Sequence, residues 1–161
     1  MTEAQSIATK TGREVVISRV LDAPRELVFE AWTDPRHVGQ WWGPHGFTNT
    51  IHEMDVRPGG VWRFIMHSPD GVDYVNKVVF IEIVKPERLV YHHGDEGVVG
   101  FHVTVTFAEH QGKTLLTMRS VFPTAEELEN VCERVGVLEG GKQTLERLGQ
   151  YVTQLALRVA Q

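Results

Sequence analysis

Cysteine is almost absent from the 161-residue sequence, in which Cys132 is the single example. One cysteine excludes an internal disulfide, so the fold must depend on packing, and we expect a reducing, cytoplasmic setting. The sequence also lacks an apolar run of about 18 residues, so we expect no membrane span. A positive net charge is missing too, because 16 Lys and Arg face 21 Asp and Glu. The resulting charge of -5 disfavours nucleic acid as a partner.

The composition is otherwise that of a folded protein. Hydrophobic residues make up 42% of the chain and charged residues 23%, as in ordinary globular domains. The length suits one compact domain. Residues 1–12 are mostly polar and lack an apolar signal-peptide core, so we predict a flexible N-terminal tail there. Residues 13–161 are then a single domain.

Hydrophobic periodicity and turn residues predict the order of the elements. A first strand is expected at 14–21, followed by a helix that starts at Pro24 and ends near Trp32. A second short helix is expected from Pro35 through Trp41 and Trp42, stopping at Gly43. Six further strands, a short acidic helix and a long amphipathic helix follow, with the two helices at 125–131 and 137–159.

One hairpin allows a test of register. If Gln111 and Gly112 form a two-residue loop, the residues of the two flanking strands pair in a fixed order. The apolar residues then share one face and the polar residues share the other, as in a sheet that is packed on one side. The expected opposite pairs are Phe107 with Leu116, Val105 with Met118, Val103 with Ser120 and Phe101 with Phe122.

Several segments resemble one known family. They are the run 21–35 (LDAPRELVFEAWTDP), Trp41-Trp42-Gly43-Pro44, residues 55–64, residues 86–89 and residues 112–114. In this order and spacing they resemble the family of activator of heat-shock protein 90 ATPase homologues, a branch of the START and polyketide cyclase superfamily, also called SRPBCC or Bet v 1-like. The likeness covers about residues 14–155.

The resemblance implies an α+β helix-grip fold. In that fold a curved seven-stranded antiparallel sheet wraps around a long C-terminal helix, two short helices follow strand one, and a cavity lies between sheet and helix. The resemblance implies no common activity, because members of the superfamily include ligand carriers, cyclases, hydrolases and co-chaperone domains.

The cavity is expected to be lined by residues that face the long helix. Alternation along the strands selects them, although a bulge between Tyr74 and Lys85 would reverse the faces in that strand. The alternative is that the purely apolar members are only packed core. The polar members are more diagnostic, because a buried polar group needs a partner. The candidate ligand-binding residues are Trp42, Phe47, Trp62, Phe64, Met66, Tyr74, Asn76, Tyr91, His93, Phe101, Val103, Met118, Ser120 and Gly141.

Three of these candidates have particular roles to test. One of the paired tryptophans is expected to anchor the second helix, while Trp42 or Phe47 closes the cavity mouth. Many members of the resembling family carry a bulky aromatic residue where this chain has Gly141. We therefore expect Gly141 to enlarge the cavity, a hypothesis that another side chain filling the same space would overturn.

Catalytic and metal chemistry have weaker support. His92 and His93 must point to opposite faces of a strand, and the sequence contains no metal-binding motif, so no metal site and no cofactor are predicted. Residues 136–142 imitate a phosphate-binding loop, but Gln143 replaces the required Ser or Thr. An acid-base enzyme needs only a positioned side chain in an apolar pocket, for which the candidates are His93, Tyr91 and Glu82.

These observations predict a small-molecule binding domain whose ligand is largely apolar or lipid-like. An acid-base enzyme of the polyketide cyclase or hydrolase type is one alternative. A co-chaperone-like interaction domain is the other, with a chaperone or a second copy of the chain as partner and a role in the stress response, as the family name implies.

Overall fold

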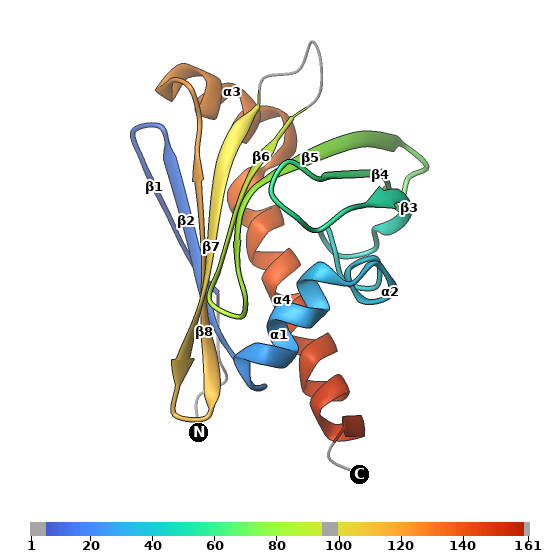
Figure 1. Cartoon of the computed structure of the whole chain (residues 1–161). Helices are drawn as coiled ribbons and strands as arrows, with labels where there is room; N and C mark the ends of the chain where they lie inside the picture. Colours follow the sequence, from blue (N-terminus) through green and yellow to red (C-terminus); the bar gives the residue numbers. More distant parts are fainter. Residues whose placement is uncertain (1–5, 95–99, 160–161) are drawn as a thin grey trace.

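A computed structural model describes residues 6–94 and 100–159 of the chain. The chain forms one antiparallel sheet with helices on a single side (Figure 1). The strands are β1 (Ile7–Thr11), β2 (Glu14–Leu21), β3 (Thr48–Met54), β4 (Val61–His67), β5 (Asp73–Val84), β6 (Arg88–His93), β7 (Phe101–His110) and β8 (Lys113–Val121). The helices are α1 (Arg25–Thr33), α2 (Pro35–Val38), α3 (Ala125–Val135) and α4 (Val137–Val159).

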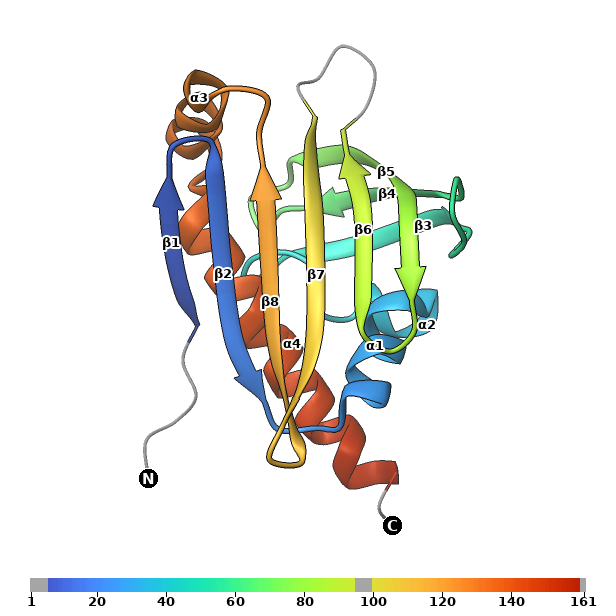
Figure 2. The ribbon, with the colours of Figure 1, turned by 60° about the vertical axis from the view of Figure 1, so that its left-hand side comes forward.

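The sheet has eight strands in the order β1-β2-β8-β7-β6-β5-β4-β3. All neighbouring strands are antiparallel, and α4 crosses the inner face of the sheet (Figure 2). The predicted α+β helix-grip architecture is therefore confirmed, with one strand more than expected.

The additional strand is β1, which corrects the predicted tail. Residues 7–11 pair with β2, beginning with Ile7 opposite Ser18 and ending with Thr11 opposite Glu14. Gly12 has a φ of 59° in the turn between the two strands, a conformation that glycine adopts without strain. β1 escaped prediction because its side chains are mostly exposed, so its sequence shows little apolar alternation. Residues 1–5 of the expected tail lie outside the described residues.

The second helix is shorter than predicted. α2 ends at Val38, and Trp41 and Trp42 lie in the turn that follows it. Asp34 begins α2, because its side chain accepts a hydrogen bond from the backbone N–H of Arg36. Trp41 nevertheless anchors this segment, since it is 1% exposed and its indole N–H donates to the carbonyl oxygen of Ala31 at 3.0 Å.

The register prediction for the β7–β8 hairpin is confirmed for three of its four pairs. Phe122, in the fourth pair, lies beyond the end of β8, although its ring stacks on Phe101 with centroids 4.5 Å apart. Phe107 lies opposite Leu116, Val105 opposite Met118 and Val103 opposite Ser120. A register shift in β5, between Phe80 and Glu82, also settles the face that the sequence left open. Before the shift the even-numbered residues of β5 face inward, and the exposed Ile81 lies within the irregularity.

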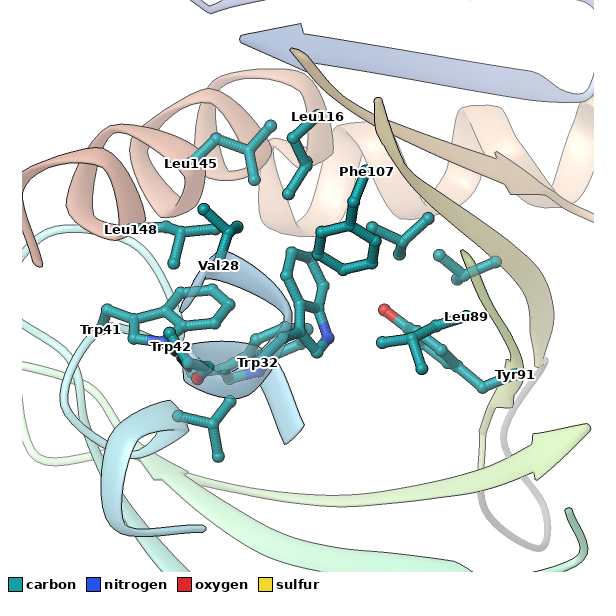
Figure 3. Close-up of a cluster of buried hydrophobic side chains, with 14 of the residues drawn as sticks. Val28, Trp32, Trp41, Trp42, Leu89, Tyr91, Phe107, Leu116, Leu145 and Leu148 are labelled. Carbon is teal, nitrogen blue, oxygen red and sulfur yellow. Dashed lines mark hydrogen bonds between the residues drawn. The ribbon is translucent and has the colours of Figure 1, made fainter. Parts of the chain in front are cut away.

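The core fills one part of the space between the sheet and α4. Three α4 side chains enter it, Leu145, Leu148 and Val152, and each is 0% exposed. Figure 3 shows Leu148 beside Trp41 and Leu145 beside Leu116. Trp32 contacts Trp41 and Trp42 with ring centroids 5.0 and 5.6 Å apart. In the described ranges, no helix is long and apolar enough to cross a membrane.

Candidate ligand cavity

A cavity of about 680 Å³ lies between the sheet and the N-terminal half of α4. Its walls come from β2, from β4 to β8, from the segment after α2, from the end of α3 and from the start of α4. Most of the lining side chains are apolar, and a few polar groups are spaced among them, which is the usual make-up of a small-molecule site.

Twelve of the fourteen sequence-predicted residues line this cavity. The two exceptions are Trp62 and Phe64 of β4, which are buried and face inward as expected but do not border the cavity. Their rings stack with centroids 4.2 Å apart, and Trp42 covers them at 5.0 and 6.0 Å. Trp62 and Phe64 therefore support the wall from behind and do not form its surface. The twelve are Trp42, Phe47, Met66, Tyr74, Asn76, Tyr91, His93, Phe101, Val103, Met118, Ser120 and Gly141.

Sequence reasoning missed the part of the wall that is formed by β2, by the end of α3 and by the start of α4. Val15 lies opposite Ser120 and Ile17 lies opposite Met118, so the inward face of β2 continues that of β8. This alternation was available in the sequence, but the pairing of β2 with β8 was needed to use it. The further lining residues are Val15, Ile17, Gly43, Pro44, Val131, Gly136, Val137, Glu139, Gly140, Gln143 and Thr144.

Gly141 lines the cavity, but the hypothesis that it adds empty space is wrong. A Cβ at this position would lie 2.1 Å from Cδ1 of Ile17, so the β2 side chain already fills the place opposite the glycine. Gly141 therefore permits a close approach of α4 to β2. The neighbouring Gly140 differs, because its Cβ would meet only Cγ of Pro44 at 3.4 Å.

The polar part of the wall centres on His93 of β6. Its Nε2 lies 2.9 Å from Oδ1 of Asn76, and Nδ2 of Asn76 donates to the Tyr74 carbonyl at 3.0 Å. Because that amide donates to a carbonyl, its oxygen faces His93, and Nε2 of the imidazole must carry the proton. Burial, with a smaller contribution from His92, lowers the pKa of His93 to about 4. His93 is therefore neutral near pH 7, with Nδ1 as a hydrogen-bond acceptor.

Tyr91 and Ser120 are deeply buried polar side chains of the wall. They are 1% and 8% exposed, and none of the hydrogen bonds found between described residues uses either hydroxyl. Burial raises the pKa of Tyr91, so its hydroxyl stays protonated and can donate. Figure 3 shows the Tyr91 side chain reaching from β6 toward Trp32.

Glu82, the third acid-base candidate, does not line the cavity. Its carboxylate accepts a hydrogen bond from Nε of Arg88 at 2.6 Å, in a solvent-accessible ion pair. The register shift between Phe80 and Glu82 explains the error, because it changes which residues of β5 face inward. Glu82 is therefore removed from the candidate site.

The segment after α2 forms one rim of the cavity, and Arg147 of α4 holds it. The guanidinium donates to the carbonyl oxygens of Gln40, Trp42, Gly43 and Pro44 at 3.0 to 3.2 Å. Burial lowers the pKa of Arg147, but its bonds here are to carbonyls and include no carboxylate. Trp42 is 7% exposed and contacts the cavity, while Phe47 packs near Tyr74 with ring centroids 6.2 Å apart.

The remaining histidines do not gather at the cavity. His92 points to the opposite face from His93 and packs on His102 with ring centroids 5.1 Å apart. Among the described residues, the ligand atoms of Glu30, Asp34 and His37 do lie within 4.8 Å of one another. Both oxygens of Asp34 accept hydrogen bonds from Arg36, which lowers the pKa of Asp34 to about 2. Nδ1 of His37 lies 2.6 Å from the Tyr151 hydroxyl, so this histidine forms a hydrogen bond between α2 and α4. The three side chains are therefore explained by contacts within and between helices.

The sheet, the long helix and the cavity between them define a member of the helix-grip class. The chain belongs to the family described as Activator of Hsp90 ATPase homolog 1-like protein, whose model matches residues 22–153. Its fold is that of the wider SRPBCC or Bet v 1-like superfamily. No curated protein matches the chain.

Solved structures show the same fold. A protein from Arthrobacter aurescens is 25% identical, with a TM-score of 0.85 over 92% of this chain and 91% of that one. Protein Ms6760 from Mycobacterium smegmatis is 25% identical, with a TM-score of 0.83 over 95% and 99%. Protein CV1439 from Chromobacterium violaceum is 28% identical, with a TM-score of 0.73 over 87% and 96%.

Proposed function

We propose that this protein binds a small, largely apolar molecule in the cavity between the sheet and α4. The observation that carries the proposal is the cavity itself, whose volume of about 680 Å³ lies within the range that is usual for small-molecule sites. Its apolar lining with a few polar groups supports carriage or sensing of such a ligand.

An acid-base enzyme is less well supported. Of the three candidate residues, Glu82 lies in an ion pair away from the cavity. Tyr91 has a raised pKa, and His93 has a pKa of about 4, so neither is tuned for proton transfer near neutral pH.

A co-chaperone-like or self-associating role, with a part in the stress response, rests on the family name. One surface feature agrees with it, because Val72, Tyr74 and Val75 are exposed where β4 and β5 are joined. Single exposed apolar side chains are common on monomers, however, so we rank this function below ligand binding. A cytoplasmic location is likewise part of the proposal and is supported by the near absence of cysteine.

Two measurements test ligand binding. Native mass spectrometry of the freshly purified protein should reveal a co-purifying small molecule. Titration with the apolar fluorophore N-phenyl-1-naphthylamine should then give saturable fluorescence, which the released molecule reduces by competition.

A matched pair of variants locates the binding. Val103 lies on the cavity wall, and its neighbour Thr104 points to the other face of the sheet. Val103→Phe should weaken fluorophore binding by about tenfold or more, since the ring occupies cavity volume, whereas Thr104→Phe should leave binding within about twofold. Equal binding by both variants would overturn the assignment of the cavity as the site.

A further inference from the structure

The cavity wall carries hydrogen-bonding groups but almost no charge, and this limits the chemistry of the ligand. No Lys or Arg is among the described lining residues, and Glu139 is the one carboxylate. The side chain of Glu139 is 69% exposed and lies 3.8 Å from Lys142, so its charge is at the solvent side of the wall. Among the side chains that the structure describes, the interior therefore offers no counter-ion to a buried anion.

One candidate for a counter-ion, Arg147, is already occupied. Arg147 lies on α4 behind the rim, where its guanidinium donates to four backbone carbonyls. To bind an anion it would have to leave these carbonyls without their donor, which costs free energy for each buried group. His93 is neutral near pH 7 and cannot replace it. A buried ligand carboxylate would therefore lose its hydration without compensation.

Tyr91 and His93 provide a place for an uncharged polar group. They are two residues apart on β6 and line the same cavity, so their side chains project from neighbouring positions on one face. Nε2 of His93 is committed to Asn76, which leaves Nδ1 as an acceptor, while the Tyr91 hydroxyl can donate. A hydroxyl group between them could donate to His93 and accept from Tyr91, whereas a carbonyl could accept from Tyr91 alone.

We propose that the cavity selects an uncharged apolar molecule with a hydroxyl group, held between Tyr91 and His93 of β6. This inference rests on the proposed ligand-binding function. It goes further by excluding fatty-acid-like anions and by ranking neutral head groups, with an alcohol above a ketone of the same length.

The test is displacement of N-phenyl-1-naphthylamine by three ligands of equal chain length, decan-1-ol, decan-2-one and decanoate, near neutral pH. The alcohol should bind about fivefold more tightly than the ketone, because it makes one hydrogen bond more. Decanoate should bind about 100-fold more weakly than the alcohol, because its charge is not compensated. Decanoate binding as tightly as the alcohol would overturn the proposal.

Variants identify the residues that hold the hydroxyl. Tyr91→Phe should weaken decan-1-ol about fivefold to tenfold while leaving the fluorophore within about twofold. Tyr151→Phe is the matched control, since Tyr151 bonds His37 and does not line the cavity, and it should change neither. Unchanged alcohol affinity in Tyr91→Phe, with fluorophore binding intact, would overturn this inference alone. Failure of the fluorophore and of all three ligands to bind the unmodified protein would overturn the proposed function as well.

Discussion

Residues 137–152 of α4 face the sheet in two halves that have opposite packing. The second half, 145–152, sends Leu145, Leu148 and Val152 into a core that leaves them 0% exposed. The first half, 137–144, borders the cavity and includes Gly140 and Gly141. One helix thus contributes to the packed core with one half and to the cavity wall with the other, so substitutions in the two halves should affect different properties.

The largest difference should appear on truncation of apolar side chains. Leu148→Ala in the packed half should lower the free energy of unfolding by about 2–5 kcal/mol, because it removes buried contacts and leaves a void. Met118→Ala on the cavity wall should cost about 1 kcal/mol, since that side chain already borders open space. Urea unfolding measures both values. Equal losses would show that the two halves are packed alike.

The rim should be sensitive to loss of its guanidinium. Arg147→Met should lower the free energy of unfolding by about 1–3 kcal/mol, because several carbonyls lose their donor. It should also weaken fluorophore binding, since Trp42, Gly43 and Pro44 line the cavity. Arg158→Met, at the exposed end of α4, is the control and should change neither quantity. Unchanged fluorophore affinity in Arg147→Met would contradict the role of Arg147 in holding the rim.

His93 of β6, on the cavity wall that faces the first half of α4, should also make stability depend on pH. The pKa of His93 is about 4 in the folded protein, below its ordinary value of about 6.5, so the unfolded chain binds more protons between these two values. Stability should therefore fall as the pH drops from about 6.5 to about 4 and should lose no more from this group below that window. His93→Gln should flatten this part of the profile. The same change at the exposed His110 should not, and a profile unaffected by His93→Gln would contradict the assignment.

The smallest effects should come from the two adjacent glycines. Gly140→Ala should raise the free energy of unfolding by about 0.5–1 kcal/mol, because alanine favours the helix and its Cβ makes an ordinary contact with Pro44. Gly141→Ala should lack this gain, because its Cβ forces Ile17 to turn, and it should weaken fluorophore binding because Ile17 lines the cavity. A similar stability gain in both variants would contradict the close approach at Gly141.

The sequence alone predicted which residues line the cavity wherever strand alternation and a known hairpin register determined the face of the sheet on which a residue lies. Val103, Met118 and Ser120 are examples, because the Gln111-Gly112 turn determines their partners. The rest depended on distances between elements that are remote in the chain. Trp42 covers Trp62 and Phe64, and Ile17 fills the space beside Gly141, neither of which any local pattern contains.

Local irregularities account for two further errors. A register shift in β5 placed Glu82 away from the cavity, and a bulge of this kind leaves only a weak mark on a single sequence. β1 went unrecognised because a mostly exposed edge strand does not need apolar alternation.

The contacts among the four tryptophans have a spectroscopic consequence. Trp42 lines the cavity, and its ring centroid lies 5.0 to 5.6 Å from those of Trp32, Trp41 and Trp62. At such separations the indoles exchange excitation energy, so light absorbed by any of them can be emitted or quenched at Trp42. The protein therefore carries its own optical reporter at the cavity wall, and its intrinsic emission should change when the cavity fills, without any added dye.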